Sequence, residues 1–211
     1  MKVVMGCAIY HDWHNIKARK SHELIRDQSK HEVAYLEVAG MNTEIAKQVM
    51  YKEFLKTDAD YFFNVDFDIV FLNPEINPID RLISLNKDIV GGIYVLRNPV
   101  ARPTYRPLDL QKEYESTGKF PENYVFKIPN KVFEVEWISG GCAMIKREVI
   151  EKLTKKYAIP NLPSIHKGEY LPEDFSFFKR ARDEGYTIWA DPAIKLGHLG
   201  TYVYTLNDYK K

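Results

Sequence analysis

Residues 58–71 read DADYFFNVDFDIVF, and they hold the clearest signal in the chain. The apolar run from Tyr61 to Val65 is typical of a strand buried in a sheet. The strand ends in Asp66 and Asp68, which point toward the same side because one residue separates them. Two such carboxylates repel unless a cation neutralises them, and their hard oxygens suit Mg2+ or Mn2+. The alternative is a strand ending in a polar turn, with solvated or capping aspartates.

Strands and helices alternate on both sides of this stretch. The pattern predicts an α/β fold, in which an open, largely parallel sheet is flanked by helices and ligands bind beyond the carboxyl ends of the strands. The expected strands cover residues 3–10, 33–38, 61–65 and 88–96. Three helices are expected in the same half. The first ends near Arg26, the second follows a cap at Asn42–Thr43, and the third begins at Asn77–Pro78.

The pattern breaks over residues 99–130, where prolines, tyrosines and charged residues predict a long irregular connection. Strand-like sequence returns in KVFEVEWISGGCAMI and is followed by an expected helix over 147–155 and a proline-rich loop over 159–166. A helix is expected to begin near Pro172 and to close at Gly185. The remaining chain is read as a strand over 186–190, a loop and an edge strand.

Composition excludes several classes of protein. The 211 residues suit one compact domain, and 30 basic against 29 acidic residues give no broad field for nucleic acid. No apolar run reaches the length of a transmembrane segment, and charge interrupts the amino terminus before a signal peptide forms. The expected location is therefore the cytoplasm. Cys7 and Cys142 lie in apolar runs without metal-ligand spacing and are expected to be buried thiols.

Three further segments carry candidate chemistry. In WISGGCAMIKREVI, Ser139 and the paired glycines Gly140 and Gly141 precede an apolar strand, which suits either close approach of a ligand or a bulge or tight turn. In LPEDFSFFKRARDEGYTIWADP, Glu173 and Asp174 begin a helix. The alternative is that the two acids only stabilise the helix, because the macrodipole favours negative charge at a helix start.

The third of these segments is LGHLG, in which His198 lies between two glycines. An imidazole there suits a metal ligand on a flexible loop, and a polar surface group is the alternative.

Together, these strings resemble glycosyltransferases of the GT-A fold, which have a DxD after a strand, then SGG, then ED at a helix start, then a histidine. NVDFDIVF, WISGGCAMIKRE, EDFSFFKRARDEGYTIWADP and LGHLG look much like the short bacterial, archaeal and viral members, and the resemblance covers nearly the whole chain. It implies a single domain over 1–211, with a nucleotide-sugar half over about 1–98 and an acceptor and catalytic half over about 99–211.

The resemblance also implies a reaction. A hexose would pass from a UDP- or GDP-sugar donor to an acceptor hydroxyl with Mn2+ or Mg2+, through inversion at the anomeric carbon. Asp66, Asp68 and His198 would be metal ligands, and both aspartates would face the donor. Asp174 would be the catalytic base, kept ionised by the helix dipole, and Glu173 would orient hydroxyl groups.

Other residues are assigned to the two substrates. The donor side is expected to include Ala8, Tyr10, Lys47, Gly140 and Gly141; the acceptor side is expected to include Arg97, Tyr105, Trp137, Ser139 and Glu173. Aromatic faces of Tyr105 and Trp137 would stack on sugar.

The chain departs from the family in three places. Lys47–Gln48 stands where many relatives carry Arg-Asn, the first strand ends in CAIYHDWH instead of a Pro-Thr-Tyr-type turn, and the QxxRW motif of processive enzymes is missing. A polymer-extruding role is therefore not expected.

Two other functions remain open from the sequence. VDFDIV also fits the nucleophile motif of haloacid-dehalogenase-type phosphatases, although that motif normally follows the first strand. A non-catalytic carbohydrate-binding protein is the third possibility. The sequence leaves the acceptor open among a carbohydrate, a lipid and a protein.

Overall fold

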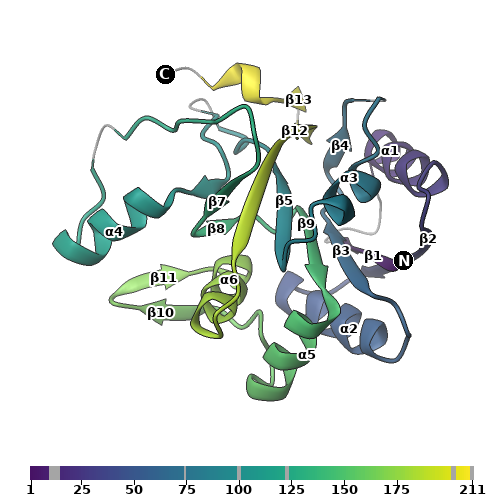
Figure 1. The fold of residues 1–211 in the computed structure, drawn as a ribbon, viewed down its shortest axis with the longest axis horizontal. Coiled ribbons are helices and arrows are strands. Elements are labelled where there is room, and N and C mark those ends of the chain that lie inside the picture. Colours follow the sequence, from purple (N-terminus) through teal and green to yellow (C-terminus); the bar gives the residue numbers. More distant parts are fainter. Residues whose placement is uncertain (10–14, 74, 99–100, 122–123, 201–202, 210–211) are drawn as a thin grey trace.

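The computed structural model describes residues 1–9, 15–73, 75–98, 101–121, 124–200 and 203–209, and it has an α/β fold (Figure 1). Within those residues, nine strands form the main sheet, with the order β13-β12-β5-β9-β3-β1-β2, while β4 and β7 also pair with β12. Their bounds are β1 (Lys2–Ile9), β2 (Glu32–Ala39), β3 (Tyr61–Val65), β4 (Ile69–Phe71), β5 (Ile89–Ile93), β7 (Phe133–Val135), β9 (Cys142–Lys146), β12 (Ile188–Leu199) and β13 (Val203–Tyr204).

The sheet is mixed. The β1–β2, β1–β3 and β5–β12 pairs are parallel, whereas β9 runs antiparallel between β3 and β5. Two small sheets stand apart from it, formed by β6 (Tyr105–Arg106) with β8 (Trp137–Ile138) and by β10 (Ser164–His166) with β11 (Glu169–Leu171). Because β9 is antiparallel, the segment that leads into it lies at the edge where β3 and β5 end.

Helices cover both faces of the sheet. They are α1 (Ile16–Asp27), α2 (Thr43–Leu55), α3 (Pro78–Ser84), α4 (Leu108–Thr117), α5 (Arg147–Lys156) and α6 (Glu173–Asp183), with a short 3-10 helix at Leu206–Asp208. The helices α2, α5 and α6 pack on one face, and α1 and α3 pack on the other. In the described part of the chain, no helix has both the length and the apolar character needed to span a membrane.

The core has two halves because successive strand residues point to opposite faces of the sheet. Phe62 of β3 belongs to the cluster under α2, α5 and α6, whereas its neighbour Phe63 belongs to the cluster under α1 and α3. Ile145 and Met144 of β9 divide in the same way. Both faces of the central strands are therefore buried, which explains why their sequences are almost continuously apolar.

Both cysteines are buried and free, as the sequence predicted. Cys7 lies in β1 and Cys142 begins β9. Burial raises the pKa of each thiol, so neither is an activated nucleophile.

Most elements expected in the first half are present close to their expected bounds. The Asn77 side chain accepts hydrogen bonds from the backbone N–H groups of Ile79 and Asp80, at 3.0 and 3.3 Å, which confirms it as the cap of α3. Asn42 stands at the cap position of α2, but its side chain makes no capping hydrogen bond.

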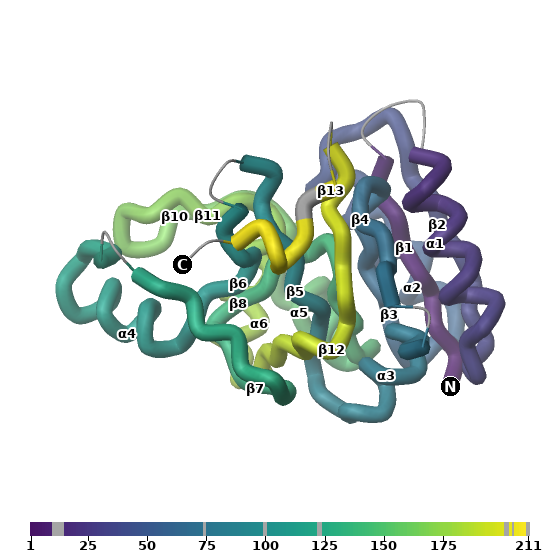
Figure 2. Tube along the Cα trace, turned by 90° about the horizontal axis from the view of Figure 1, so that it is seen from above, coloured from purple at the N-terminus to yellow at the C-terminus, as the bar shows by residue number. Residues whose placement is uncertain are grey.

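Three expectations for the second half are wrong. The stretch over 99–130 contains β6 and α4 instead of only irregular chain, and the proline-rich loop leads into the β10–β11 hairpin. The segment around His198 is the last part of the long strand β12 and not a flexible loop. Figures 1 and 2 both show α4 and the hairpin at the end of the molecule opposite α1, β1 and β2.

Gly91 permits the close pairing of β5 with β9, and it provides a test of the packing. A Cβ atom there would lie 2.1 Å from the carbonyl oxygen of Cys142 and 2.6 Å from Cδ1 of Ile138. Because covered strands cannot move apart freely, Gly91→Ala is expected to lower the free energy of unfolding by about 1–3 kcal/mol. Urea denaturation measures the change, and an unaltered midpoint and slope would contradict this account of the pairing.

Candidate active site

The site lies at the edge of the sheet where β3, β5 and β12 end and β9 and α6 begin. Val65 pairs with Cys142, and immediately beyond them the backbone N–H of Asp66 donates to the Gly141 carbonyl at 3.1 Å. This pairing holds the DxD segment against the SGG segment. Residues far apart in the sequence therefore meet here because of the sheet topology.

Gly140 and Gly141 are glycines because side chains of the site press against their backbone. A Cβ at Gly141 would lie 2.8 Å from Oδ2 of Asp66 and 2.5 Å from the Tyr94 hydroxyl. A Cβ at Gly140 would lie 2.9 Å from Nζ of Lys47. Both glycines lie in a turn, as one of the alternatives expected, but neither has a positive φ, so the turn by itself does not require glycine at these positions.

Asp174 is held at the first turn of α6 by donors from the SGG segment. Its Oδ2 accepts from the Ser139 hydroxyl and from the Gly140 backbone N–H, both at 3.0 Å. Its Oδ1 accepts from the backbone N–H of Phe175 at 2.8 Å. The Tyr94 hydroxyl donates to Ser139 Oγ at 2.6 Å and extends this chain of hydrogen bonds.

The electrostatic environment of Asp174 differs from the expectation. The sequence predicted that the helix dipole alone would keep its carboxylate ionised. Burial instead raises the pKa of Asp174, and the carboxylate of Glu173 adds to that shift. The Lys47 ammonium and the donors from Gly140 and Ser139 oppose it. A raised pKa makes the carboxylate a stronger base than a solvated one.

Lys47 is the buried cation of the cluster. It lies on α2 with only 2% of its surface exposed, and its Nζ is 3.6 Å from Oε1 of Glu173. Burial alone would lower the pKa of its ammonium, but nearby carboxylates outweigh that effect and raise it, namely Asp66, Glu173 and Asp174. Lys47 therefore stays charged and partly neutralises the acids.

Asp66 keeps an excess of negative surroundings in spite of Lys47. The pKa of its carboxyl is raised to about 6, chiefly by burial, while Lys47 opposes this shift. The neighbouring carboxylates contribute to the increase, namely Asp68, Asp174 and Glu173. A site in which a carboxylate is this costly to ionise favours a bound cation.

His198 lies in β12 and faces Asp68, the residue that precedes β4. Its Nδ1 lies 2.8 Å from the Val95 carbonyl oxygen, and its Nε2 lies 3.5 Å from Oδ2 of Asp68. A carbonyl only accepts, so the Val95 contact places a proton on Nδ1 and leaves Nε2 as the ring nitrogen that faces the carboxylate. Such a pairing suits a cation between the two groups.

In this structure, the Arg97 guanidinium supplies the positive charge beside the Asp68 carboxylate. Its Nη1 lies 2.8 Å from Oδ2 of Asp68 and donates to the Leu199 carbonyl at 2.8 Å. Among the described residues, no three ligand-type side chains are already gathered as a metal centre. Asp66, Asp68 and His198 fit a divalent cation by donor type and charge, provided that the half-exposed Arg97 side chain moves away from Asp68.

An aromatic pocket of about 320 Å³ adjoins the carboxylate cluster at Ser139. Tyr105 and Trp137 line it, but neither offers a free face for sugar stacking. Tyr105 is 1% exposed, and its hydroxyl donates to the Lys127 carbonyl. Phe175 stacks on Trp137 with ring centroids 3.5 Å apart.

The structure does not bring every expected residue together. The expected site residues that meet at this edge are Lys47, Asp66, Asp68, Arg97, Ser139, Gly140, Gly141, Glu173, Asp174 and His198. Ala8 belongs to the hydrophobic core, and Tyr10 lies outside the described residues.

Two residues that support the site are not predicted from the sequence. Asn64 is buried in β3 and donates through Nδ2 to the Gly140 carbonyl. Tyr94 binds Ser139 and accepts from the Gly141 N–H at 3.3 Å. A signal existed for Asn64, because an amide inside an otherwise apolar strand needs a partner.

Sequence comparison finds no matching family model and no matching curated protein. Among solved structures, the A197 protein from STIV aligns with a TM-score of 0.59 and 18% identity, over 95% of this chain and 86% of its own. GalNAc-T7, solved with UDP, GalNAc and Mn2+, aligns with a TM-score of 0.57 and 11% identity over 98% of this chain. The match covers 46% of GalNAc-T7, so this chain spans under half of it. These likenesses establish a Rossmann-like α/β fold of the GT-A kind.

Proposed function

We propose that this chain is a glycosyltransferase that needs a divalent cation and moves a hexose from a nucleotide-diphosphate sugar to an acceptor hydroxyl. The observation that carries the proposal is the Asp68–His198 pair, in which Oδ2 and Nε2 lie 3.5 Å apart, together with the Asp66 carboxylate, which Asp68 affects electrostatically. The fold shared with GalNAc-T7, a protein solved with UDP and Mn2+, supports the same reading.

Asp66, Asp68 and His198 would hold Mn2+ or Mg2+, which supplies charge stabilisation for a departing diphosphate. The rest of the donor would lie along the glycine backbone at Gly140 and Gly141. Lys47, behind Gly140, would act from a distance by partly neutralising the acids. In this proposal the donor-binding half is about 1–98 and the acceptor-binding and catalytic half is about 99–211.

Asp174 would take the proton of the acceptor hydroxyl. As that oxygen forms a bond to the anomeric carbon, the bond from the anomeric carbon to the phosphate oxygen breaks, and its electron pair leaves with the nucleoside diphosphate. Ser139 and the Gly140 N–H fix the direction of the Asp174 carboxylate. Attack from the face opposite the leaving group gives inversion, and Glu173 would orient the hydroxyls.

The direct test is a screen of UDP- and GDP-sugars for Mn2+-dependent hydrolysis or transfer by the purified chain. The proposal expects one donor to be turned over with Mn2+ or Mg2+ and to be left intact in EDTA. Proton NMR of the first product from an α-linked donor reports the stereochemistry, and an α-linked product would rule out inversion. Turnover of the preferred donor in EDTA at the full rate would remove the metal from the proposal.

Arg97 and His198 give predictions of opposite sign. Arg97 competes with a cation for Asp68, so Arg97→Ala is expected to lower the Mn2+ concentration for half-maximal nucleotide-diphosphate binding by about two- to fivefold. His198→Ala removes a ligand and is expected to raise that concentration by at least about 10-fold. Thermal stabilisation by UDP or GDP during a Mn2+ titration measures both changes.

Arg26→Ala is the matched control for Arg97, because Arg26 pairs with Asp27 on α1 away from the site. It should leave the Mn2+ dependence unchanged. If His198→Ala also leaves it unchanged, the histidine is only a structural partner of Val95. If Arg97→Ala raises the Mn2+ requirement, the guanidinium assists the bound state instead of competing with the metal.

A further inference from the structure

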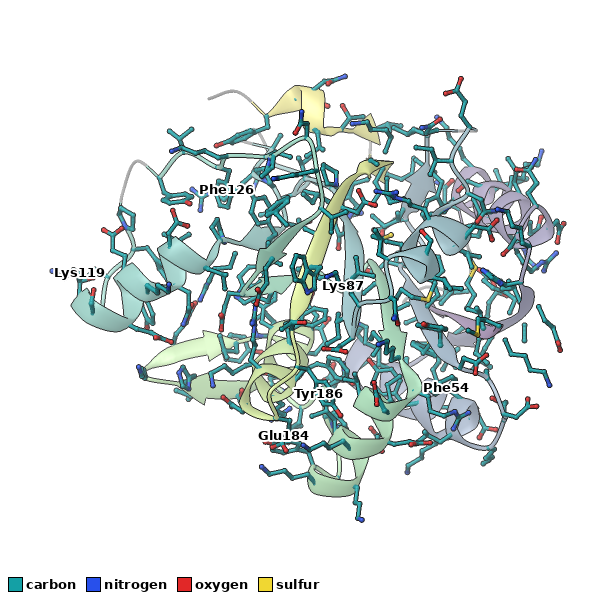
Figure 3. All side chains as sticks on the ribbon, viewed as in Figure 1. Phe54, Lys87, Lys119, Phe126, Glu184 and Tyr186 are labelled. Carbon is teal, nitrogen blue, oxygen red and sulfur yellow. The ribbon has the colours of Figure 1, made fainter. Side chains whose placement is uncertain are left out.

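The aromatic pocket beside the carboxylate cluster has a chemistry different from the cluster itself. Its volume is about 320 Å³, within the range of small-molecule sites. The apolar wall is formed chiefly by Tyr105, Leu110, Phe120, Phe126, Trp137 and Phe175. Figure 3 labels Phe126 on the α4 side of the molecule, above that helix. The pocket therefore lies between α4, which the sequence did not reveal, and the sheet edge at Ser139.

Most polar groups of the pocket wall already form hydrogen bonds within the protein. The Thr104 hydroxyl donates to the Tyr94 carbonyl at 2.8 Å. The Arg106 guanidinium forms two hydrogen bonds to Glu169, at 3.0 and 2.6 Å, and a third to Gln111. A saccharide needs a partner for nearly every hydroxyl, whereas this wall offers few.

The faces of Trp137 are also engaged. Phe175 stacks on its ring at 3.5 Å, and the Arg106 guanidinium carbon lies 4.8 Å from the ring centroid. Its Nε1–H is buried and has no hydrogen-bond partner among the described residues. Trp137 thus contributes apolar ring surface to the pocket wall, without an open stacking face.

The pocket is coupled to the expected catalytic base. Ser139 belongs to its wall and also donates to Asp174 Oδ2 at 3.0 Å. Phe175, another wall residue, follows Asp174 directly at the start of α6. If the apolar part of a ligand fills the pocket, a hydroxyl on the adjacent part of the same ligand would lie near Asp174.

We propose that the pocket binds an apolar, ring-sized group attached to the acceptor, so that the acceptor is a hydroxyl compound with an aryl-like portion and not a free saccharide. Naming the ligand as the acceptor rests on the proposed function. The binding of an apolar group to the pocket does not.

The test compares phenyl β-glucoside with methyl β-glucoside as ligands of the intact chain, without any donor. Burial of a phenyl ring is expected to make the phenyl compound bind about 10- to 100-fold more tightly. Quenching of tryptophan fluorescence reports binding. Trp137→Phe should remove the response, while Trp189→Phe should keep it, because Trp189 lies in β12 beside Lys87 and is not part of the pocket wall.

Two leucine variants separate filling of the pocket from a change in stability. Leu110 is buried in the wall, so Leu110→Phe should weaken binding of phenyl β-glucoside at least about 10-fold and leave that of methyl β-glucoside unchanged. Leu162→Phe is the matched control at an exposed position outside the wall. Circular dichroism and thermal melting verify that both variants fold.

The outcomes distinguish the two proposals. Equal affinity for the phenyl and methyl compounds, no saturable response to the phenyl compound, or wild-type affinity in Leu110→Phe would each overturn the pocket assignment. UDP and GDP binding with Mn2+ is measured on the same samples. If the phenyl compound binds as expected but neither nucleotide binds with Mn2+, the pocket assignment stands and the glycosyltransferase proposal fails.

Discussion

Asp174→Asn is expected to lower the rate of sugar transfer by about 100- to 10,000-fold, which is the usual contribution of a positioned general base. Asparagine preserves the size of the side chain and still accepts the Gly140 N–H, but it cannot take a proton from the acceptor. Nucleotide diphosphate and Mn2+ should bind as in the wild type. Steady-state transfer rates and a calorimetric titration of the same preparation measure the two properties.

The matched control is Asp183→Asn at the other end of α6, where the carboxylate pairs with Lys179 on the surface. It should transfer sugar at the wild-type rate. If Asp174→Asn also retains transfer and loses only thermal stability, the acid merely stabilises the helix start. A loss of nucleotide binding would instead place Asp174 in the donor site.

Asp68→Ala is expected to reduce transfer by at least about 1,000-fold, since fixed positive charge at a leaving diphosphate contributes several kcal/mol. The variant should also lose metal-dependent nucleotide binding. The fold should survive, because the partners left by Asp68 are the half-exposed Arg97 and His198, which keeps its hydrogen bond to Val95. Asp58→Ala, at an exposed aspartate before β3, is the control and should behave like the wild type.

The sequence predicted the first half of the fold well because its elements are long and carry strong patterns. β3 is buried along its whole length, and the Asn77–Pro78 start of α3 is a local signal. In contrast, α4 buries only Leu110 and Gln111, so it shows little amphipathic periodicity. The strands β10 and β11 have three residues each and leave Ile165 and Tyr170 exposed, which hides the usual alternation.

The prediction of a loop around His198 is wrong for a different physical reason. Glycines on both sides of a histidine are typical of a loop. A Cβ at Gly197 would lie 2.7 Å from Cγ1 of Val203 and 2.8 Å from Cγ2 of Val70, so the glycine permits close packing inside a strand. Tertiary contacts of this kind leave no mark in the neighbouring sequence.

Part of the candidate site was visible in the sequence, and part depends on the folded chain. Asp66 and Asp68 stand at a recognisable strand end, and Asp174 stands at a recognisable helix start. The contact of Arg97 with Asp68 joins the end of β5 to the DxD segment, and only the sheet order brings them together. Burial at Asp174 is likewise a tertiary effect that residue type and position do not reveal.

Calorimetric titration of UDP and GDP into the wild type and Asp68→Asn, each with Mn2+ and each with EDTA, tests whether a cation at Asp68 holds the nucleotide. If it does, one nucleotide binds saturably to the wild type in Mn2+ and at least about 10-fold more weakly in EDTA, and its binding to Asp68→Asn does not depend on Mn2+. Failure of both nucleotides to bind with Mn2+, together with stabilisation by beryllium fluoride and Mg2+, would contradict it and indicate a phosphatase that forms an aspartyl-phosphate.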